Sequence, residues 1–188
     1  PVPQHATKEN TLSPSDLGCA KALPSADGLD EEAAKLRGTR IHLLLEHFAT
    51  IPVENWDAIA LALLGDVPDL SDLIVEAKRV VTDPNLQFLF AKGSLCEIPI
   101  TANLPEFPNR TLHGVVDRLI VNVADVWVVD FKTNISVPQS VESCPEGLLR
   151  QMGAYAHALT QVFPDHEVST AILWTRTARL MALPHDLV

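Results

Sequence analysis

Residues 112–134 read LHGVVDRLIVNVADVWVVDFKTN, and this stretch decides the fold. Its two arms are rich in valine, isoleucine and leucine, which favour strands. The break between them, residues 122–125, contains asparagine and aspartate, which favour turns. The pattern therefore predicts an antiparallel hairpin in which Val121 pairs with Val126.

This register places two carboxylates opposite each other. Counting back along the hairpin, Asp117 lies across from Asp130, and because side chains alternate along a strand, Lys132 shares their face. Neighbouring carboxylates repel each other and are costly to bury without a compensating cation. A bound divalent metal ion explains the cluster, whereas the alternative is a set of surface charges on an edge hairpin. The apolar residues on both faces of the two arms favour central strands, and therefore the metal.

Composition limits the classes of protein to consider. The chain has 188 residues, 47% of them hydrophobic, which is enough for one domain with a substantial core. Its formal net charge of −10 argues against a domain that holds nucleic acid by general electrostatic attraction. An active site could still receive a strand that another module delivers. No apolar run reaches the length of a membrane span, and no signal-peptide pattern opens the chain.

The cysteines give a weaker indication. Cys19, Cys96 and Cys144 are scattered along the chain, which favours a reducing, cytoplasmic location. They cannot by themselves complete a four-cysteine zinc or iron–sulfur site, so no iron–sulfur cluster is expected.

The first half of the chain reads as helical. Residues 1–30 are rich in proline and are expected to form a linker with short turns. After them an apolar stripe at helical spacing, which starts at Ile41, predicts a helix with one buried face. Two more helices are expected over residues 55–64, capped by Asn55, and 70–82.

A strand over residues 94–104 precedes the hairpin. Pro99 within it favours an edge position or a bulge, because proline cannot donate to a ladder. Glu97 has two interpretations, as a solvated edge charge or as an additional acidic group near the metal, and the pattern does not decide between them.

A crossover helix follows the hairpin. Residues 146–163 carry a buried stripe that ends at Val162, and Gln151 and Tyr155 share one helical face. The helix leads into a strand over residues 168–175, which implies a parallel pair with the second arm of the hairpin, and a short final strand follows. We therefore expect an α/β fold with a mixed sheet flanked by helices and an extra helical region at the N-terminus.

Several motifs together resemble those of the RecB-type nucleases of the PD-(D/E)XK superfamily. They are G-x-x-x-H at residues 38–42, G-x-x-D at 114–117, D-F-K-T at 130–133 and Q-x-x-x-Y at 151–155. They also occur in that family's order, and the residues around Glu97 resemble its glutamate-bearing first strand. The resemblance implies a restriction-endonuclease-like core, with a nuclease domain over residues 31–188 that divides into a helical part (31–90) and a sheet core (94–188).

The resemblance also implies a site for Mg²⁺ or Mn²⁺. Its ligands would be the carboxylates of Asp117 and Asp130, the carbonyl of Phe131 and the ring of His42. Glu97 would be an accessory acidic group.

The same resemblance assigns the remaining catalytic roles. Lys132 would orient or deprotonate the attacking water and stabilise negative charge on the phosphate. Gln151 and Tyr155 would position the DNA strand or brace Lys132. The product would be a cut phosphodiester.

The segment AILWTRTARLMALP, residues 171–184, resembles the end of the AddA helicase–nuclease family. Members of that family process double-strand DNA ends together with an AddB-like partner subunit. The sequence contains no G-x-x-x-x-G-K-[ST] phosphate loop, so we expect the nuclease domain alone, acting on a single strand that a helicase motor delivers. The alternatives are an autonomous single-strand exonuclease and an inactive module that holds DNA or a partner. Intact Asp117, Asp130 and Lys132 argue against the inactive module.

Overall fold

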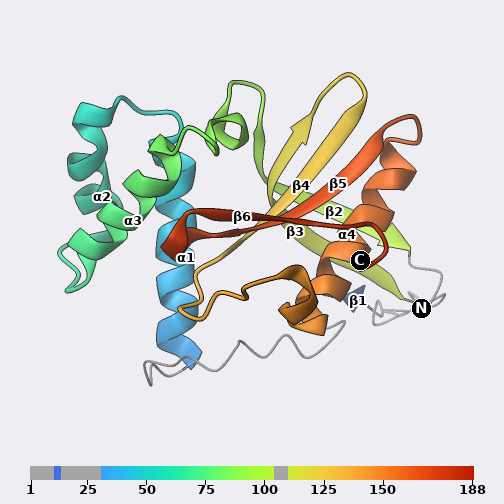
Figure 1. Ribbon diagram of the computed structural model, residues 1–188. Coiled ribbons are helices and arrows are strands. Elements are labelled where there is room, and N and C mark those ends of the chain that lie inside the picture. The colour runs from blue at the N-terminus through green and yellow to red at the C-terminus, as the bar shows by residue number, and fades with distance from the viewer. Residues whose placement is uncertain (1–10, 14–30, 104–109) are drawn as a thin grey trace, which may run out of the picture.

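The computed structural model describes residues 11–13, 31–103 and 110–188 (Figure 1). Short turns of 3-10 helix are labelled η. In chain order the elements are β1 (Thr11–Leu12), α1 (Glu31–Phe48), η2 (Val53–Asn55), α2 (Trp56–Leu64), α3 (Leu70–Thr82), η3 (Gln87–Phe90), β2 (Leu95–Asn103), β3 (Thr111–Val121), β4 (Asp125–Lys132), η4 (Val141–Ser143), α4 (Glu146–Val162), β5 (Glu167–Trp174), η5 (Thr175–Thr177) and β6 (Arg179–Leu183).

β3 and β4 form the antiparallel hairpin that the sequence predicts. Val121 pairs with Val126, and the regular pairing continues back along β3 as far as Arg118. The next position of the same register holds Asp117 on β3 and Asp130 on β4. The two carboxylates therefore stand where the two strands begin to separate.

The strands form one six-stranded sheet in the order β1-β3-β4-β5-β6, with β2 also paired to β3. β4 and β5 are parallel, with α4 between them in the chain, and β5 and β6 are antiparallel. Among the described strands β2 pairs with β3 alone, which agrees with the edge position that Pro99 predicts. The α/β class, with a mixed sheet flanked by helices, is confirmed.

Residues 11–12 differ from the sequence prediction. They form β1, which pairs in parallel with β3, and not a part of a linker. Leu12 is buried in a small cluster with Leu112 and Ala154, and this burial helps to hold β1 against the sheet. The turn expected near residue 14 lies outside the described residues.

Helices cover both faces of the sheet (Figure 1). α1, α2 and α3 pack against one face and α4 against the other. The side chains of β4 alternate between these two faces. Val129 and Phe131 join the first core cluster, whereas Val126 and Val128 join the second. β4 is therefore a central strand, as its apolar residues predict.

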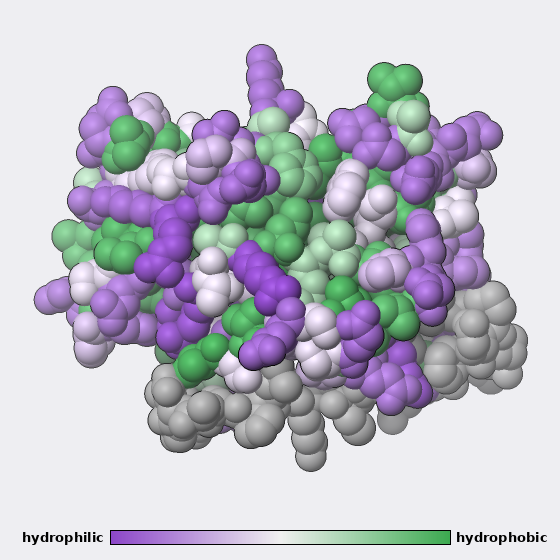
Figure 2. Space-filling model, in the orientation of Figure 1, coloured by the Kyte–Doolittle hydropathy of each residue, from purple (hydrophilic) through white to green (hydrophobic). Residues whose placement is uncertain are grey.

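Figure 2 shows the outer surface of one side, where hydrophilic residues surround a more apolar centre. No helix in the described part of the chain has both the length and the apolar character that crossing a membrane requires.

Two helix ends differ from expectation. Val162 is 63% exposed, because α4 ends there and the next residue, Phe163, packs against the core instead. Asn55 stands at the N-cap of α2, but its side chain makes no capping hydrogen bond. The preceding turn η2 already supplies the carbonyl of Val53 to the backbone N–H of Trp56.

Candidate active site

Asp117 stands at the point where β3 and β4 separate. Its Oδ2 accepts a hydrogen bond from the backbone N–H of Phe131 at 2.5 Å. The carboxylate thereby replaces the backbone carbonyl that a continuing ladder would offer to this N–H. Asp117 is held by the strand that carries Asp130, so the hairpin itself fixes the two carboxylates next to each other. The Phe131 carbonyl as a metal ligand stays a prediction.

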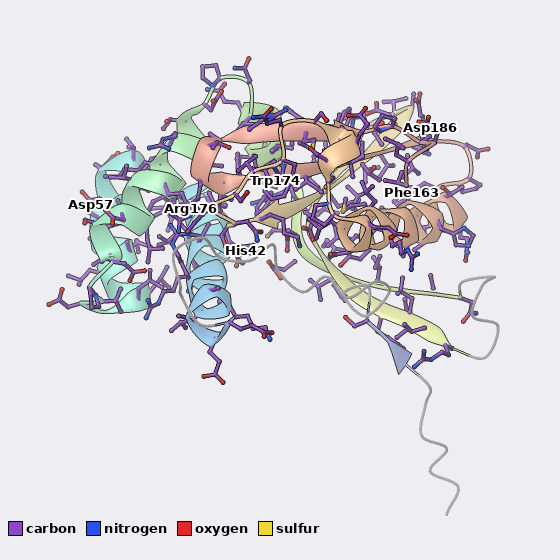
Figure 3. The ribbon with its side chains drawn as sticks, turned by 60° about the horizontal axis from the view of Figure 1, so that its bottom comes forward. His42, Asp57, Phe163, Trp174, Arg176 and Asp186 are labelled. Carbon is purple, nitrogen blue, oxygen red and sulfur yellow. The ribbon has the colours of Figure 1, made fainter. Side chains whose placement is uncertain are left out.

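α1 brings an imidazole to Asp117. His42 Nδ1 lies 3.4 Å from Asp117 Oδ1, and the His42 ring meets the Phe131 ring edge-on with centroids 5.7 Å apart. The adjacent Ile41 and, one turn on, Leu45 are fully buried. This apolar stripe fixes the side of α1 that faces the sheet, and His42 lies at its border (Figure 3).

Gly38, the first residue of the histidine motif, brings α1 beside Thr133. A Cβ added at residue 38 would lie 3.6 Å from Thr133 Oγ1, which is an ordinary van der Waals distance. The approach of α1 to the D-F-K-T segment therefore tolerates an alanine in place of the glycine.

β2 brings Glu97 to the same place. Its neighbours on β2 are paired with β3, but Glu97 itself is not, and its backbone φ of +52° lies in the left-handed region. Ligand atoms of His42, Glu97 and Asp117 all lie within 4.8 Å of one another. Backbone strain at a non-glycine residue is characteristic of functional sites. The geometry favours the second interpretation of Glu97, as an acidic group at the metal site.

Asp130 is engaged by two other partners. Its Oδ1 accepts a hydrogen bond from Gln151 Nε2 at 2.9 Å, and its Oδ2 lies 2.5 Å from Lys132 Nζ. Asp130 is buried, so these two contacts compensate its desolvation. Among the described residues, the group of clustered ligand atoms contains His42, Glu97 and Asp117, and Asp130 as a metal ligand stays a prediction.

α4 supplies Gln151 and Tyr155, one helical turn apart. The Gln151 amide that bonds Asp130 also lies 3.5 Å from Tyr155 Oη, and Tyr155 Oη donates to the backbone carbonyl of Val115 at 2.8 Å. Burial raises the pKa of Tyr155, so its hydroxyl stays a neutral donor. The pair thus braces Asp130 and the backbone of β3, and Asp130 in turn pairs with Lys132.

The charged groups shift one another's pKa values. Burial alone would lower the pKa of Lys132, but the adjacent Asp130 carboxylate outweighs burial and raises it. Burial would likewise lower the pKa of His42, and the hydrogen bond and charge of Asp117 raise it instead. Burial raises the pKa values of Asp130 and Glu97, and the negative charge of Asp117 adds to both shifts. A site crowded with carboxylates suits a divalent cation, and an imidazole nitrogen joins such a ligand set once it has lost its proton.

A buried polar network behind the site was not predicted from the sequence. Glu76 of α3 forms an ion pair with Arg37 of α1 and accepts a hydrogen bond from Thr175 Oγ1 at 2.5 Å. The same hydroxyl lies 3.3 Å from the backbone carbonyl of Lys132. The network therefore joins two helices to the end of β4. A carboxylate within the buried stripe of α3 is the signal that could have revealed it.

A family model described as the PD-(D/E)XK nuclease superfamily matches residues 17–181. A search of curated proteins finds no match. A solved structure titled "Crystal structure of SSO0001" aligns with a TM-score of 0.36 and 12% sequence identity, over 79% of this chain and 76% of that chain, a similarity too low to carry an argument. On the strength of the family match, this chain belongs to the PD-(D/E)XK nuclease superfamily.

Proposed function

We propose that the chain is a deoxyribonuclease domain that hydrolyses phosphodiester bonds with Mg²⁺ or Mn²⁺. Members of its superfamily are nucleases that use divalent metals. The observation that carries the proposal is the meeting of two sets of residues where β3 and β4 separate. One is the group of ligand atoms from His42, Glu97 and Asp117, and the other is the ion pair of Asp130 with Lys132.

The donor set supports a metal of this kind. Glu97 and Asp117 would hold it through carboxylate oxygens and His42 through a ring nitrogen, and Asp130 is the further ligand that we expect. A nitrogen among oxygen ligands suits Mn²⁺, whereas Mg²⁺ prefers oxygen alone. When bound, such a cation polarises the phosphoryl oxygen and lowers the pKa of a coordinated water.

Lys132 is the residue that we assign to the chemical step. Burial lowers the pKa of Lys132 but Asp130 outweighs it and raises the pKa, which favours the ammonium form, and we assign Lys132 the role of a donor. Its ammonium can orient the attacking water and stabilise the negative charge that develops on the phosphate. Gln151 fixes Asp130, and Asp130 fixes Lys132, so the ammonium is preorganised for this task.

The biological setting is the finer part of the proposal. A RecB-type domain of an AddA-like helicase–nuclease would process double-strand DNA ends for recombinational repair in the cytoplasm, beside an AddB-like partner subunit. The order of the four motifs and the AddA-like segment at residues 171–184 support this assignment. The net charge of −10 supports it as well, because such a domain gains from a motor that delivers the strand.

A nuclease assay tests the proposal. The chain is incubated with a fluorescently labelled single-stranded oligonucleotide in Mg²⁺, in Mn²⁺ or in EDTA. We expect cleavage with either metal, faster with Mn²⁺, and none in EDTA. Cleavage that persists in EDTA contradicts the metal dependence. Binding of the oligonucleotide without cleavage in either metal supports the inactive binding module instead.

A further inference from the structure

Arg176, in the turn η5 between β5 and β6, carries a positive charge that no described carboxylate balances. By contrast, Arg40 on the neighbouring α1 pairs with Asp69 at 3.1 Å. The side-chain hydrogen bond of Arg176 runs from Nε to the neutral backbone carbonyl of Thr133 at 3.3 Å. In a chain with a net charge of −10, a guanidinium that no described carboxylate balances, beside the candidate active site, indicates an anionic ligand.

The position of Arg176 is tied to the strand that bears Lys132. Thr133, whose carbonyl Arg176 contacts, directly follows Lys132 in the chain. Thr175 Oγ1, from the residue before Arg176, lies 3.3 Å from the Lys132 carbonyl oxygen. Figure 3 shows Arg176 and His42 where α1 meets the sheet. The turn η5 therefore holds a guanidinium at the same end of β4 from which Lys132 enters the site.

Two hydrogen bonds to backbone carbonyls, its own and that of Thr133, hold Arg176 in place, and neither of them pairs its charge with a carboxylate. Its own carbonyl accepts a hydrogen bond from Arg79 Nη1 at 2.9 Å, and its Nε is anchored on Thr133. The residue is half-buried, so packing restricts the aliphatic part of its side chain. Anchoring through Nε leaves the two Nη groups with no partner among the described residues. A guanidinium held this way presents paired donors that match two oxygens of one phosphate.

We propose that Arg176 binds the backbone phosphate adjacent to the one that is cut. The inference rests on the proposed function, because it requires a nucleic-acid strand in the site. The ligand class is a phosphodiester of a single strand, recognised by charge and shape without regard to the base. By holding the neighbouring phosphate, Arg176 contributes binding energy that keeps the strand in the site.

The test pairs protein variants with modified substrates. Single-stranded oligonucleotides carry one neutral methylphosphonate at each internucleotide position in turn, and cleavage kinetics are measured for wild type, Arg176→Gln and Arg176→Lys. Arg110→Gln is the matched control, because it removes the same charge from an exposed arginine just before β3. Melting temperatures of all variants are compared to confirm that they fold.

For wild type, we expect one position beside the cut at which the methylphosphonate raises KM about tenfold, the effect of one lost charge-assisted contact. Arg176→Gln should raise KM about tenfold on the unmodified strand, with kcat within about twofold, and should lose the sensitivity at that position. Arg176→Lys should fall between the two, since it keeps the charge and loses the paired donors.

Two results would separate the subsite from the proposed function. If wild type cuts and Arg176→Gln keeps the wild-type pattern of sensitivity, or matches Arg110→Gln in KM, the subsite is overturned alone. If Arg176→Gln melts at a lower temperature than wild type, Arg176→Lys takes its place in the test. A fully wild-type pattern of methylphosphonate sensitivity in Arg176→Lys then overturns the subsite. If wild type cuts none of the oligonucleotides in Mg²⁺ or Mn²⁺, the proposed function itself fails.

Discussion

At the scale of residues, Lys132 and Asp130 neutralise each other before any cation is bound. Replacing Lys132 by alanine should lower kcat about 10²- to 10³-fold, since the ammonium stabilises charge in the transition state. Mn²⁺ affinity should stay equal or rise, because the Asp130 carboxylate loses its competing cation. Calorimetry with Mn²⁺ and single-turnover cleavage measure the two effects, with Lys78→Ala, which breaks an exposed pair with Asp57, as the control. Lost Mn²⁺ binding with an unchanged rate would contradict the assigned role.

Glu97 combines an exposed carboxylate near Asp117 with a backbone φ of +52°. Glu97→Gln keeps the shape and removes the charge, so Mn²⁺ affinity should fall about tenfold while stability is unchanged. Glu97→Gly should lose the same affinity and be at least as stable, since glycine adopts a positive φ without strain. Equilibrium Mn²⁺ titration and thermal unfolding check both, and Glu54→Gln in the exposed turn η2 serves as the control. If Glu97→Gln binds Mn²⁺ as tightly as wild type, Glu97 is only a solvated edge charge.

At the scale of elements, the placement of Lys132 depends on α3 as well as on the hairpin. Thr175→Val removes the hydroxyl that Glu76 accepts from and leaves a buried carboxylate oxygen without this donor. We expect a loss of about 1–3 kcal/mol in the free energy of unfolding. We also expect a fall of about tenfold in kcat, since the Lys132 carbonyl at the end of β4 loses its contact with the Thr175 hydroxyl. Urea unfolding and cleavage rates measure the two.

The same turn contains the control for that prediction. Thr177 is exposed, and its hydroxyl makes only a 3.4 Å hydrogen bond to the Trp174 carbonyl, so Thr177→Val should change neither quantity. Thr175→Ser keeps the hydroxyl and should restore most of both losses. Equal effects of Thr175→Val and Thr177→Val would show that the network does not position Lys132.

Local pattern explains why the hairpin could be predicted. The turn fixes the pairing of Val121 with Val126, and strand alternation then places Asp117 and Asp130 across from each other. The strained φ of Glu97 and its approach to Asp117 arise from pairing between distant segments, which no local pattern encodes. Helix ends were also unreliable, because a stripe continues in sequence past the place where packing stops, as at Val162.

Longer-range features were missed for a related reason. The hydrogen bond between Glu76 and Thr175 joins residues 99 positions apart, and nothing in the spacing of either segment points to the other. β1 is only two residues long, too short to show a period. The site was predicted where its residues lie on one hairpin or one helix, and was incomplete where separate elements supply the partners.

At the scale of the whole molecule, the net charge of −10 limits how well the chain captures DNA alone. Non-specific binding is largely neutralisation of phosphates, and one divalent ion offsets only part of the acidic excess. The isolated chain should therefore cut slowly at low DNA concentration. A chain joined to a helicase motor should cut faster at low DNA concentration, because delivery raises the effective concentration of the strand. At saturating DNA the two proteins should cut at the same rate.

The comparison uses one single-stranded substrate at matched Mg²⁺ and salt, with rates measured over a range of DNA concentrations. Equal rates for the isolated chain and the motor-linked protein at low DNA would show that the chain captures its own substrate. The autonomous exonuclease would then be the better description.

The central claim is that a metal-dependent nuclease site is built around Asp117. Asp117→Asn retains an oxygen that can accept the Phe131 N–H, so the fold should persist while a charged ligand is lost. The decisive measurement is the rate of cleavage of a labelled single-stranded oligonucleotide in Mn²⁺ by Asp117→Asn, with Asp57→Asn, on the exposed surface of α2, as the matched control. We predict a loss of at least about 10²-fold for Asp117→Asn and none for Asp57→Asn. A folded Asp117→Asn protein that cuts at the wild-type rate would contradict the account.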